Sequence, residues 1–271
     1  MSTLPPTAHA TWKAVRADAR DRGGARVSAS VDTAGPPGSD RSNGRVRLPR
    51  GWATLLSLRA IVLPVKSLSE TKSRLGPMLT PLERGALTLA MLEDVMDVTL
   101  QIAGWDTWVV SPDEAVLEIA LGRSAHAIRE EKPPLANAIR QVEEEALGRE
   151  ADALAVLLPD TPFVTTDALT RALHTLGPVV LAPSTDEGGT NLLVRRPPTA
   201  IHARFGPDSY RKHLEAAATA DLPTSIVGAP ELAFDLDLPS DILTVLDARR
   251  QGRTREVCLG MDLASRIATR A

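Results

Sequence analysis

The chain has 271 residues, enough for one large or two small domains, and 43% of them are hydrophobic, which suffices for a sizeable core. A net charge of −3, a pI near 6.0 and 3% aromatic residues argue against a nucleic-acid-binding surface and favour a small-molecule partner. The single cysteine excludes an internal disulfide, and the histidines show no metal-ligand spacing. No apolar run is long enough to span a bilayer, and the N-terminus lacks a signal peptide's apolar centre, so we expect a cytoplasmic protein.

Residues 1–57 differ in composition from the rest of the chain. They are rich in Arg, Gly, Ser, Ala and Pro, and glycine and proline pairs interrupt any apolar periodicity. The segment has too little apolar surface to offset the entropy of ordering, so it is predicted to be a disordered extension that can be deleted through Gly51. A mis-assigned upstream start explains the same composition equally well.

The first ordered element is a compact apolar run at 59–65, which predicts a buried strand. A basic loop follows it directly and carries Lys66, Lys72 and Arg74. Cations at the carboxyl end of a first strand favour a clamp for polyphosphate. A solvated polar loop is the alternative. No Walker-type glycine loop is present, so side chains and other backbone groups would have to hold phosphates.

The next elements alternate between helix and strand. Thr80, Pro81 and Glu83 form the signature of a capping box, which predicts a helix from there to about residue 102, and Leu87, Met91, Val95 and Val98 give this helix an apolar face. The pattern then predicts strands at 107–110 and 126–129 and helices at 114–121 and 135–147. Such alternation is typical of an α/β fold with a mostly parallel, helix-covered sheet. Asn137 lies in the first turns of the last of these helices, where its amide can read a base edge or simply be a polar helix residue.

The unbroken apolar run at 153–158 ends on Pro159 and Asp160. Such a run is typical of a strand buried on both faces of a parallel sheet. Ligands bind outside the carboxyl ends of such strands, so Asp160 stands where a metal or phosphate site would be built. A turn aspartate that caps the next helix is the alternative. Asp235 and Asp237 favour the site, because two carboxylates one residue apart point to the same side of an extended chain.

Two further loops are candidates for anion binding. A helix is predicted at 166–176, a strand at 179–183 and another at 192–195, and the loop between the two strands contains Gly188 and Gly189. These glycines would let backbone N–H groups approach an anion, although a plain hairpin turn would use them as well. The segment 205–209 leads into a helix that continues through His213, and Asp208 and Ser209 are expected to cap its N-terminus.

The last part of the chain is predicted to contain a strand at 224–227 and a final core helix at about 238–248. The remaining tail, 249–271, carries four arginines in its first seven residues. We expect it to form a surface helix with frayed ends.

Several segments in order resemble the 2-phospholactate and phosphoenolpyruvate guanylyltransferases of deazaflavin coenzyme F-420 biosynthesis. They are Pro64-Val65-Lys66, Lys72-Ser73-Arg74-Leu75, Ala90-Met91-Leu92-Glu93-Asp94, Val110-Ser111-Pro112-Asp113, Gly188-Gly189-Thr190-Asn191, Arg204-Phe205-Gly206-Pro207-Asp208-Ser209 and Asp235-Leu236-Asp237. The resemblance covers roughly residues 58–248. It implies one Rossmann-like nucleotidyltransferase domain, flanked by the extension and the tail. It also implies an enzyme that joins GTP to a small phosphorylated acid and releases pyrophosphate.

The resemblance also implies roles for individual residues. Asp160, Asp235 and Asp237 match the family's magnesium-binding carboxylates, so Mg²⁺ is the expected cofactor. Thr190, Gly206 and Ser209 match positions that hold the phosphorylated acid. Lys66, Lys72 and Arg74 match the basic loop that faces the GTP phosphates and serves catalysis, and Asn137 matches a position near the nucleotide. Around Asp160 this sequence has Pro159 and Thr161, where relatives usually carry a small residue and leucine.

The expected acceptor is phosphoenolpyruvate, with 2-phospho-L-lactate as the main alternative and 3-phosphoglycerate third. Rival enzymes of the same fold are a molybdopterin guanylyltransferase, a sugar-phosphate nucleotidyltransferase and a glycosyltransferase that uses Asp-x-Asp. The first-strand loop, which lacks their glycine-rich turn, argues against these rivals. A non-catalytic nucleotide-binding module is the alternative from another class. No nucleic-acid or membrane partner is expected, and a homodimer is compatible with these interpretations.

Overall fold

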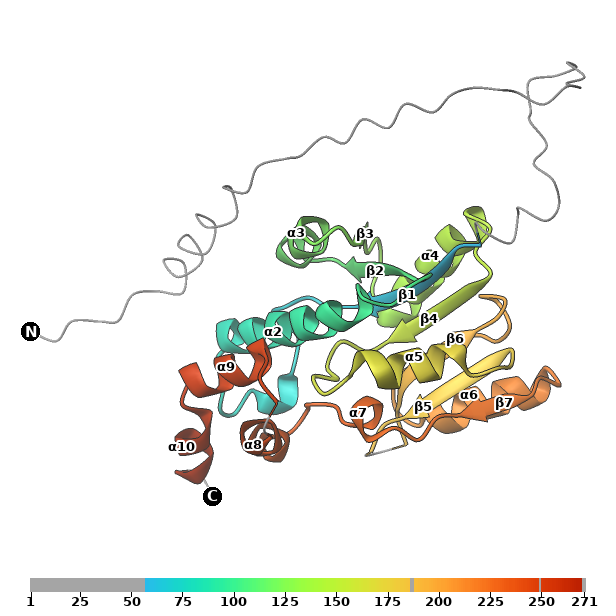
Figure 1. The fold of residues 1–271 in the computed structure, drawn as a ribbon. Helices are drawn as coiled ribbons and strands as arrows, with labels where there is room; N and C mark the ends of the chain where they lie inside the picture. Colours follow the sequence, from blue (N-terminus) through green and yellow to red (C-terminus); the bar gives the residue numbers. More distant parts are fainter. Residues whose placement is uncertain (1–56, 186–187, 249, 270–271) are drawn as a thin grey trace, which may run out of the picture. The chain divides into compact units, whose positions relative to one another are not determined.

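Alternating strands and helices build an α/β fold around a mostly parallel sheet, as the sequence predicts (Figure 1). The computed structural model describes residues 57–185, 188–248 and 250–269. Within these ranges the sheet has seven strands in the order β3-β2-β1-β4-β6-β5-β7. Residues 1–56 lie outside the described part of the chain, so the disordered extension and its tolerance of deletion stay predictions.

The strand directions bring the carboxyl ends of the parallel strands and the amino end of one antiparallel strand to the same edge of the sheet. β1 pairs in parallel with β2 and β4, β2 with β3, and β5 with β7, whereas β6 runs antiparallel to both β4 and β5. The start of β6 therefore lies beside the carboxyl ends of β1 and β4. The strands are β1 (Arg59–Pro64), β2 (Asp106–Ser111), β3 (His126–Arg129), β4 (Ala153–Leu157), β5 (Val179–Pro183), β6 (Thr190–Arg195) and β7 (Thr224–Ile226).

Helices cover both faces of this sheet (Figure 1). They are α2 (Pro81–Thr99), α3 (Glu114–Gly122), α4 (Leu135–Gly148), α5 (Thr166–His174), α6 (Ser209–Thr219), α7 (Pro230–Ala233), α8 (Pro239–Asp247), α9 (Arg253–Gly260) and α10 (Leu263–Ala268), with a short 3₁₀ turn, η2 (Ser73–Leu75), after β1. Buried residues of α2, α3, α5 and α7 share one hydrophobic cluster, whereas those of α4 and of α6 belong to two other clusters.

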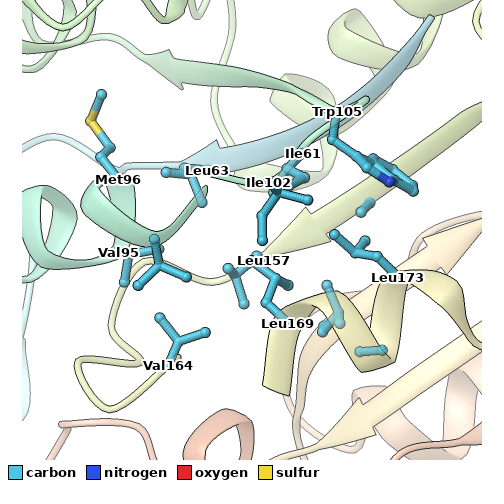
Figure 2. Packing of buried hydrophobic residues seen from close by; sticks show 14 of the residues in the cluster. Ile61, Leu63, Val95, Met96, Ile102, Trp105, Leu157, Val164, Leu169 and Leu173 are labelled. Atoms are coloured by element: carbon cyan, nitrogen blue, oxygen red, sulfur yellow. The ribbon is translucent and has the colours of Figure 1, made fainter. Parts of the chain in front are cut away.

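Successive residues of the central strands pack against opposite layers, as the two-residue period of a strand requires. Ile61 and Leu63 of β1 join Val95 of α2 and Leu169 of α5 in the largest cluster, which Figure 2 shows. Ala60 and Val62 instead face the cluster that contains α4. The strands are thus buried on both sides, which explains why their sequences are continuous apolar runs rather than alternating ones.

The long helix α2 begins as the sequence predicts and ends earlier. Thr80 Oγ1 accepts a hydrogen bond from Glu83 N, and Glu83 Oε2 accepts one from Thr80 N, so the capping box is confirmed. The helix ends at Thr99, not at about residue 102. Its last bonds shorten from four-residue to three-residue spacing, because Gln101 N donates to Val98 O and Ile102 N to Thr99 O.

The expectation of a surface tail after residue 248 is wrong. α9 and α10 pack against α2 and α8, and Thr254, Cys258 and Leu263 are buried. Asp94 of α2 accepts hydrogen bonds from the backbone N–H groups of Arg253 and Thr254, at 2.8 and 2.9 Å, and so caps the first turn of α9. The tail is part of the domain, and its arginine-rich composition concealed the buried positions.

Within the described ranges, none of the helices combines the length and the apolar character needed to cross a membrane.

Candidate functional site

A cleft of about 400 Å³ opens at the edge of the sheet where β1 and β4 end and β6 begins. Its position is the one at which open α/β sheets bind ligands, beside the point where the strand order reverses. Nine of the ten residues that the sequence analysis selected line it, from five segments that are far apart in the chain. They are Lys66, Lys72, Arg74, Asp160, Thr190, Gly206, Ser209, Asp235 and Asp237.

Main-chain hydrogen bonds bring the carboxylate segments together. Leu236 N donates to Asp160 O at 3.0 Å, and this bond ties the segment after α7 to the loop after β4. Leu236 is fully buried, so the residues on either side of it, Asp235 and Asp237, both face the cleft. The local sequence thus places two carboxylates opposite Asp160, as the one-residue spacing predicts. In the same loop, Thr161 Oγ1 donates to Leu158 O and closes the turn around Asp160.

Lys72 occupies the centre of this carboxylate group. Its Nζ lies 2.7 Å from Asp160 Oδ2 and 2.7 Å from Asp237 Oδ1, and its side chain is only 5% exposed. Burial alone would lower the pKa of the Lys72 ammonium, but the two carboxylates outweigh burial and raise that pKa above its usual value. From the sequence, Lys72 is expected to face phosphate. In this structure its ammonium contacts protein carboxylates instead.

The three carboxylates differ in how well the neighbouring cations compensate them. Burial, reinforced by the negative charges of Asp160 and Asp237, raises the pKa of Asp235 to about 6. Burial also acts to raise the pKa of Asp237, but Lys72 and the more distant Arg74, 3.7 Å away, outweigh it and lower that pKa. Asp235 is thus the carboxylate that the neighbouring cations compensate least, and a cation bound beside it would favour its ionised form.

The donor set suits magnesium, which prefers oxygen ligands and commonly keeps waters and substrate phosphates in its shell. Asp160 Oδ1 is buried and accepts no hydrogen bond from the described residues, which leaves one well-placed oxygen available. In those parts of the chain, however, no group of three or more His, Cys, Asp or Glu side chains is arranged to hold a metal ion. The Lys72 ammonium lies between two of the three carboxylates, so the magnesium site stays a prediction that requires Lys72 to move.

A second group of cleft-lining residues, called the polar wall below, carries hydroxyl groups and no charge: Thr190, Gly206 and Ser209. Thr190 begins β6, and Ser209 begins α6, and both are about 2% exposed while lining the cleft. Gly206 adopts a φ of +112°, which a residue with a side chain rarely adopts, so the turn before α6 requires glycine. Asp208 occupies the N-cap position of α6, as expected, but the expected capping by its side chain does not occur. Asp208 has a left-handed backbone, with a φ of 56°, and its side chain makes no capping hydrogen bond.

Two residues that the sequence analysis did not select hold the basic loop in place. Asp113 Oδ2 accepts a hydrogen bond from Leu68 N at 2.8 Å, and Arg84 donates to the carbonyl oxygens of Thr71 and Leu79. Asp113 follows the carboxyl end of β2 just as Asp160 follows β4. Its place after a predicted strand is therefore the sequence signal for this role.

Asn137 is the one selected residue that does not line the cleft. Its amide Nδ2 donates to Pro133 O at 2.8 Å, within its own helix start, whereas Leu135 of the same segment does contribute to the lining. Its role beside the nucleotide stays a prediction.

Comparison with known proteins identifies the family to which this chain belongs. Residues 59–263 match the family described as guanylyl transferase CofC like. A phosphoenolpyruvate guanylyltransferase of Sphaerobacter thermophilus is 40% identical over 67% of this chain and 89% of its own length. A 3-phospho-D-glycerate guanylyltransferase of Phenylobacterium zucineum is 36% identical over 76% of this chain and 96% of its own. A 2-phospho-L-lactate guanylyltransferase of Methanocaldococcus jannaschii is 31% identical over 67% and 80%.

Solved structures agree on the fold. A nucleotidyl transferase from Methanothermobacter thermautotrophicus superposes with a TM-score of 0.55 at 17% sequence identity, over 70% of this chain and 96% of the other. The sequence match extends to residue 263, beyond the expected limit near 248, which agrees with the packing of α9 and the start of α10 into the domain.

Proposed function

The chain belongs to the CofC-like guanylyl transferases, and from this premise we propose that it transfers the guanylyl group of GTP to phosphoenolpyruvate. A phosphate oxygen of the acid attacks the α-phosphorus of GTP and forms a new P–O bond. The bond between the α-phosphorus and the β-phosphate oxygen breaks, and pyrophosphate leaves with its electron pair. The product is enolpyruvoyl-2-diphospho-5′-guanosine, an intermediate suited to coenzyme F-420 biosynthesis.

The observation that carries this proposal is that one cleft is lined by two unlike groups of residues. One group, the charged wall, has three carboxylates, two lysines and an arginine, and the other, the polar wall, has two hydroxyls and a glycine turn. A triphosphate with its cation needs the first kind of surface, whereas a small dianionic acid is held well by hydroxyl and backbone donors. The reaction requires both molecules to lie side by side, which the shared cleft supports.

The charged wall would bind and orient the triphosphate. Asp160, Asp235 and Asp237 would hold Mg²⁺, which when bound neutralises charge on the phosphate oxygens and favours attack. Lys66 and Arg74 are exposed and line the cleft, so their side chains can contact the phosphates. Lys72 would exchange its carboxylate partners for a phosphate oxygen when a cation takes its place.

The proposed reaction requires no general base from the protein. The attacking group is a phosphate, whose second pKa is about 6, so it is already anionic near neutral pH. Catalysis then rests on holding two anions in line and on neutralising charge around the α-phosphorus.

The choice of acceptor rests on the relatives rather than on the cleft. Phosphoenolpyruvate, 2-phospho-L-lactate and 3-phosphoglycerate each carry a carboxylate near a phosphate, and the polar wall reads charge and size rather than the geometry of one carbon. The relative with the highest identity among those described above is named for phosphoenolpyruvate. 2-Phospho-L-lactate is therefore kept as the alternative acceptor.

A panel of acids tests the assignment. The purified protein is incubated with GTP, magnesium and each of the three acids separately, pyrophosphate release is followed, and the product is identified by mass. We expect the highest kcat/KM with phosphoenolpyruvate. Turnover with 2-phospho-L-lactate but none with phosphoenolpyruvate would overturn the choice of acceptor, and no turnover with any acid would overturn the proposed function.

A further inference from the structure

His213 connects the two segments that form the polar wall of the cleft. It lies on α6 and is fully buried, so it does not itself reach the cleft surface. One ring nitrogen, Nδ1, lies 3.1 Å from Thr190 Oγ1, at the start of β6. The other, Nε2, lies 2.8 Å from the backbone N of Arg204, which precedes the segment 205–209.

These two contacts determine where the imidazole proton resides. A backbone N–H can only donate, so Nε2 must accept from Arg204 and carries no proton. A neutral imidazole has one N–H, which therefore lies on Nδ1 and donates to Thr190 Oγ1. Because the Thr190 oxygen accepts this bond, the threonine's own hydroxyl proton is left to be donated elsewhere. Thr190 lines the cleft, so an anion bound there can supply the acceptor oxygen.

We propose that His213, in its Nδ1–H tautomer, is the positioning residue of the acceptor site. Its Nδ1–H turns the Thr190 hydroxyl into a donor aimed at the phosphorylated acid, and its Nε2 fixes the backbone from which Phe205 to Ser209 extend. The identity of the bound acid rests on the proposed function. The arrangement of donor and acceptor in the protein does not.

The surroundings of the ring favour the neutral form that this role needs. Burial, together with the positive charges of Arg195 and Arg204, lowers the pKa of His213 to about 4. The ring of Phe205 packs against the imidazole at 5.1 Å between centroids and 71° between planes, which restricts rotation of the imidazole. A histidine held neutral and immobile in this way orients a neighbour and does not shuttle protons.

Two substitutions separate this role from a general effect on folding. Replacement His213→Gln keeps an acceptor for Arg204 N but removes the imidazole N–H that faces Thr190, whereas Thr190→Val removes the hydroxyl that His213 orients. Each is expected to raise the KM for the acid about tenfold, the worth of one hydrogen bond to a charged group, and to leave the KM for GTP unchanged. The variant His213→Asn, whose amide can donate at the Nδ1 position, is expected to restore the KM for the acid to within about threefold of wild type.

The double variant decides whether the two residues act as one unit. If His213 acts through the Thr190 hydroxyl, then His213→Gln adds less than about twofold to the KM of Thr190→Val, since the bond that it orients is already gone. Independent effects, which would multiply to about a hundredfold, would overturn the proposal. So would an equal rise in the KM for GTP, which a merely structural role predicts. Urea midpoints of all variants verify that the folded state is being compared.

A measurement on the unmodified protein is independent of any activity. Nitrogen-15 shifts of the His213 ring should show Nδ1 protonated and Nε2 unprotonated at pH 7.5. A protonated Nε2 would overturn the proposal even if the enzyme is active. If no acid is turned over, the proposed function fails and this measurement still decides the arrangement around His213.

Discussion

The stability of the cleft depends on how the charges of its residues compensate one another. One buried ammonium, that of Lys72, forms ion pairs with Asp160 and Asp237, and Asp235 adds a third negative charge beside them. Removing different members of this group should therefore change stability in opposite directions. Removing any of the three carboxylates should lower turnover to a similar extent, because all three are proposed to hold the same cation.

Asp237→Asn and Asp235→Asn form a matched pair. Without magnesium, Asp237→Asn should lower the free energy of unfolding by about 1–2 kcal/mol, because Lys72 loses one of its two partners. Asp235→Asn should leave that free energy unchanged or raise it, on the order of 1 kcal/mol, because it relieves repulsion between carboxylates. Both should reduce magnesium-dependent turnover at least about 100-fold. Urea unfolding and pyrophosphate release measure the two effects. Near-normal rates for either variant at saturating magnesium would place the metal elsewhere.

The neutral state of His213 makes stability depend on pH. Its pKa is about 4 in the folded protein and 6.5 in the unfolded chain, so the unfolded state binds the proton first. Above pH 6.5 the neutral His213 costs no stability. As the pH falls from 6.5 to 4, proton binding to the unfolded chain lowers the free energy of unfolding, and the loss is about 2 kcal/mol at pH 5. Urea unfolding from pH 8 to pH 5 should show wild type losing stability relative to His213→Gln, which cannot titrate. A difference that stays constant with pH would contradict this explanation.

The sequence revealed site residues whose placement follows from local rules. Asp160 follows the end of a buried strand, where parallel sheets bind ligands, and Asp235 and Asp237 flank a single buried leucine, so they face the same side of the chain. The pairing of Lys72 with carboxylates and the link from His213 to Thr190 could not be predicted, because each depends on a distance between segments remote in the chain. Asn137 shows the reverse, since its side chain is used locally.

At the level of helices and strands, boundaries follow apolar periodicity closely where the element is buried. The predicted strands and the helices α3, α4 and α8 agree with the structure to within two residues. The errors occur at ends decided by hydrogen bonding, as at Thr99 and Asp208, and in the tail. There, many arginines and few apolar residues hid a buried face of Thr254, Cys258 and Leu263.

One carboxylate of α2, that of Asp94, caps the first turn of α9, and Glu93 and Asp97 of α2 form ion pairs with Arg253. Asp94 accepts two backbone bonds and the Thr254 hydroxyl, and a Cβ at Gly252 would lie 2.9 Å from Asp94 Oδ2, so glycine allows this close approach. Asp94→Ala should lower the free energy of unfolding by about 1–3 kcal/mol, because two backbone donors lose their partner. Asp97→Ala, on the same helix, removes ion pairs with the part-exposed side chains of Arg123 and Arg253 but no backbone acceptor. It is the control and should cost less than about 1 kcal/mol.

The reactivity of the Cys258 thiol measures whether α9 stays packed against the domain, independently of an unfolding experiment. Burial raises the pKa of its thiol to about 11, so wild type should react very slowly with a thiol-specific disulfide reagent at pH 8. Asp94→Ala should accelerate that reaction at least about tenfold, since α9 opens more often, whereas Asp97→Ala should not. Rapid modification of the wild-type protein would show that α9 is not docked as described.

For the whole molecule, the sheet order explains why residues separated by more than 150 positions meet in one cleft. The strand order reverses beside β1, and β6 runs antiparallel to β4 and β5. The carboxyl ends of β1 and β4 and the start of β6 therefore lie at the edge of the sheet where the cleft opens. The sequence predicts a mostly parallel sheet but not the strand order. That order depends on which neighbour each strand pairs with, and buried apolar strands satisfy any neighbour equally well. That the extension can be deleted through Gly51 stays a prediction.

The central claim is that this cleft joins an intact phosphorylated acid to the α-phosphorus of GTP. Phosphoenolpyruvate labelled with oxygen-18 in its phosphate is incubated with GTP, magnesium and the protein, and both products are examined by mass spectrometry. We predict that every labelled oxygen is retained in the guanosine diphosphate ester and that pyrophosphate carries no label, since the acid's phosphate is the attacking group. Label in the pyrophosphate, or GTP consumption without a guanylylated acid, would contradict the account.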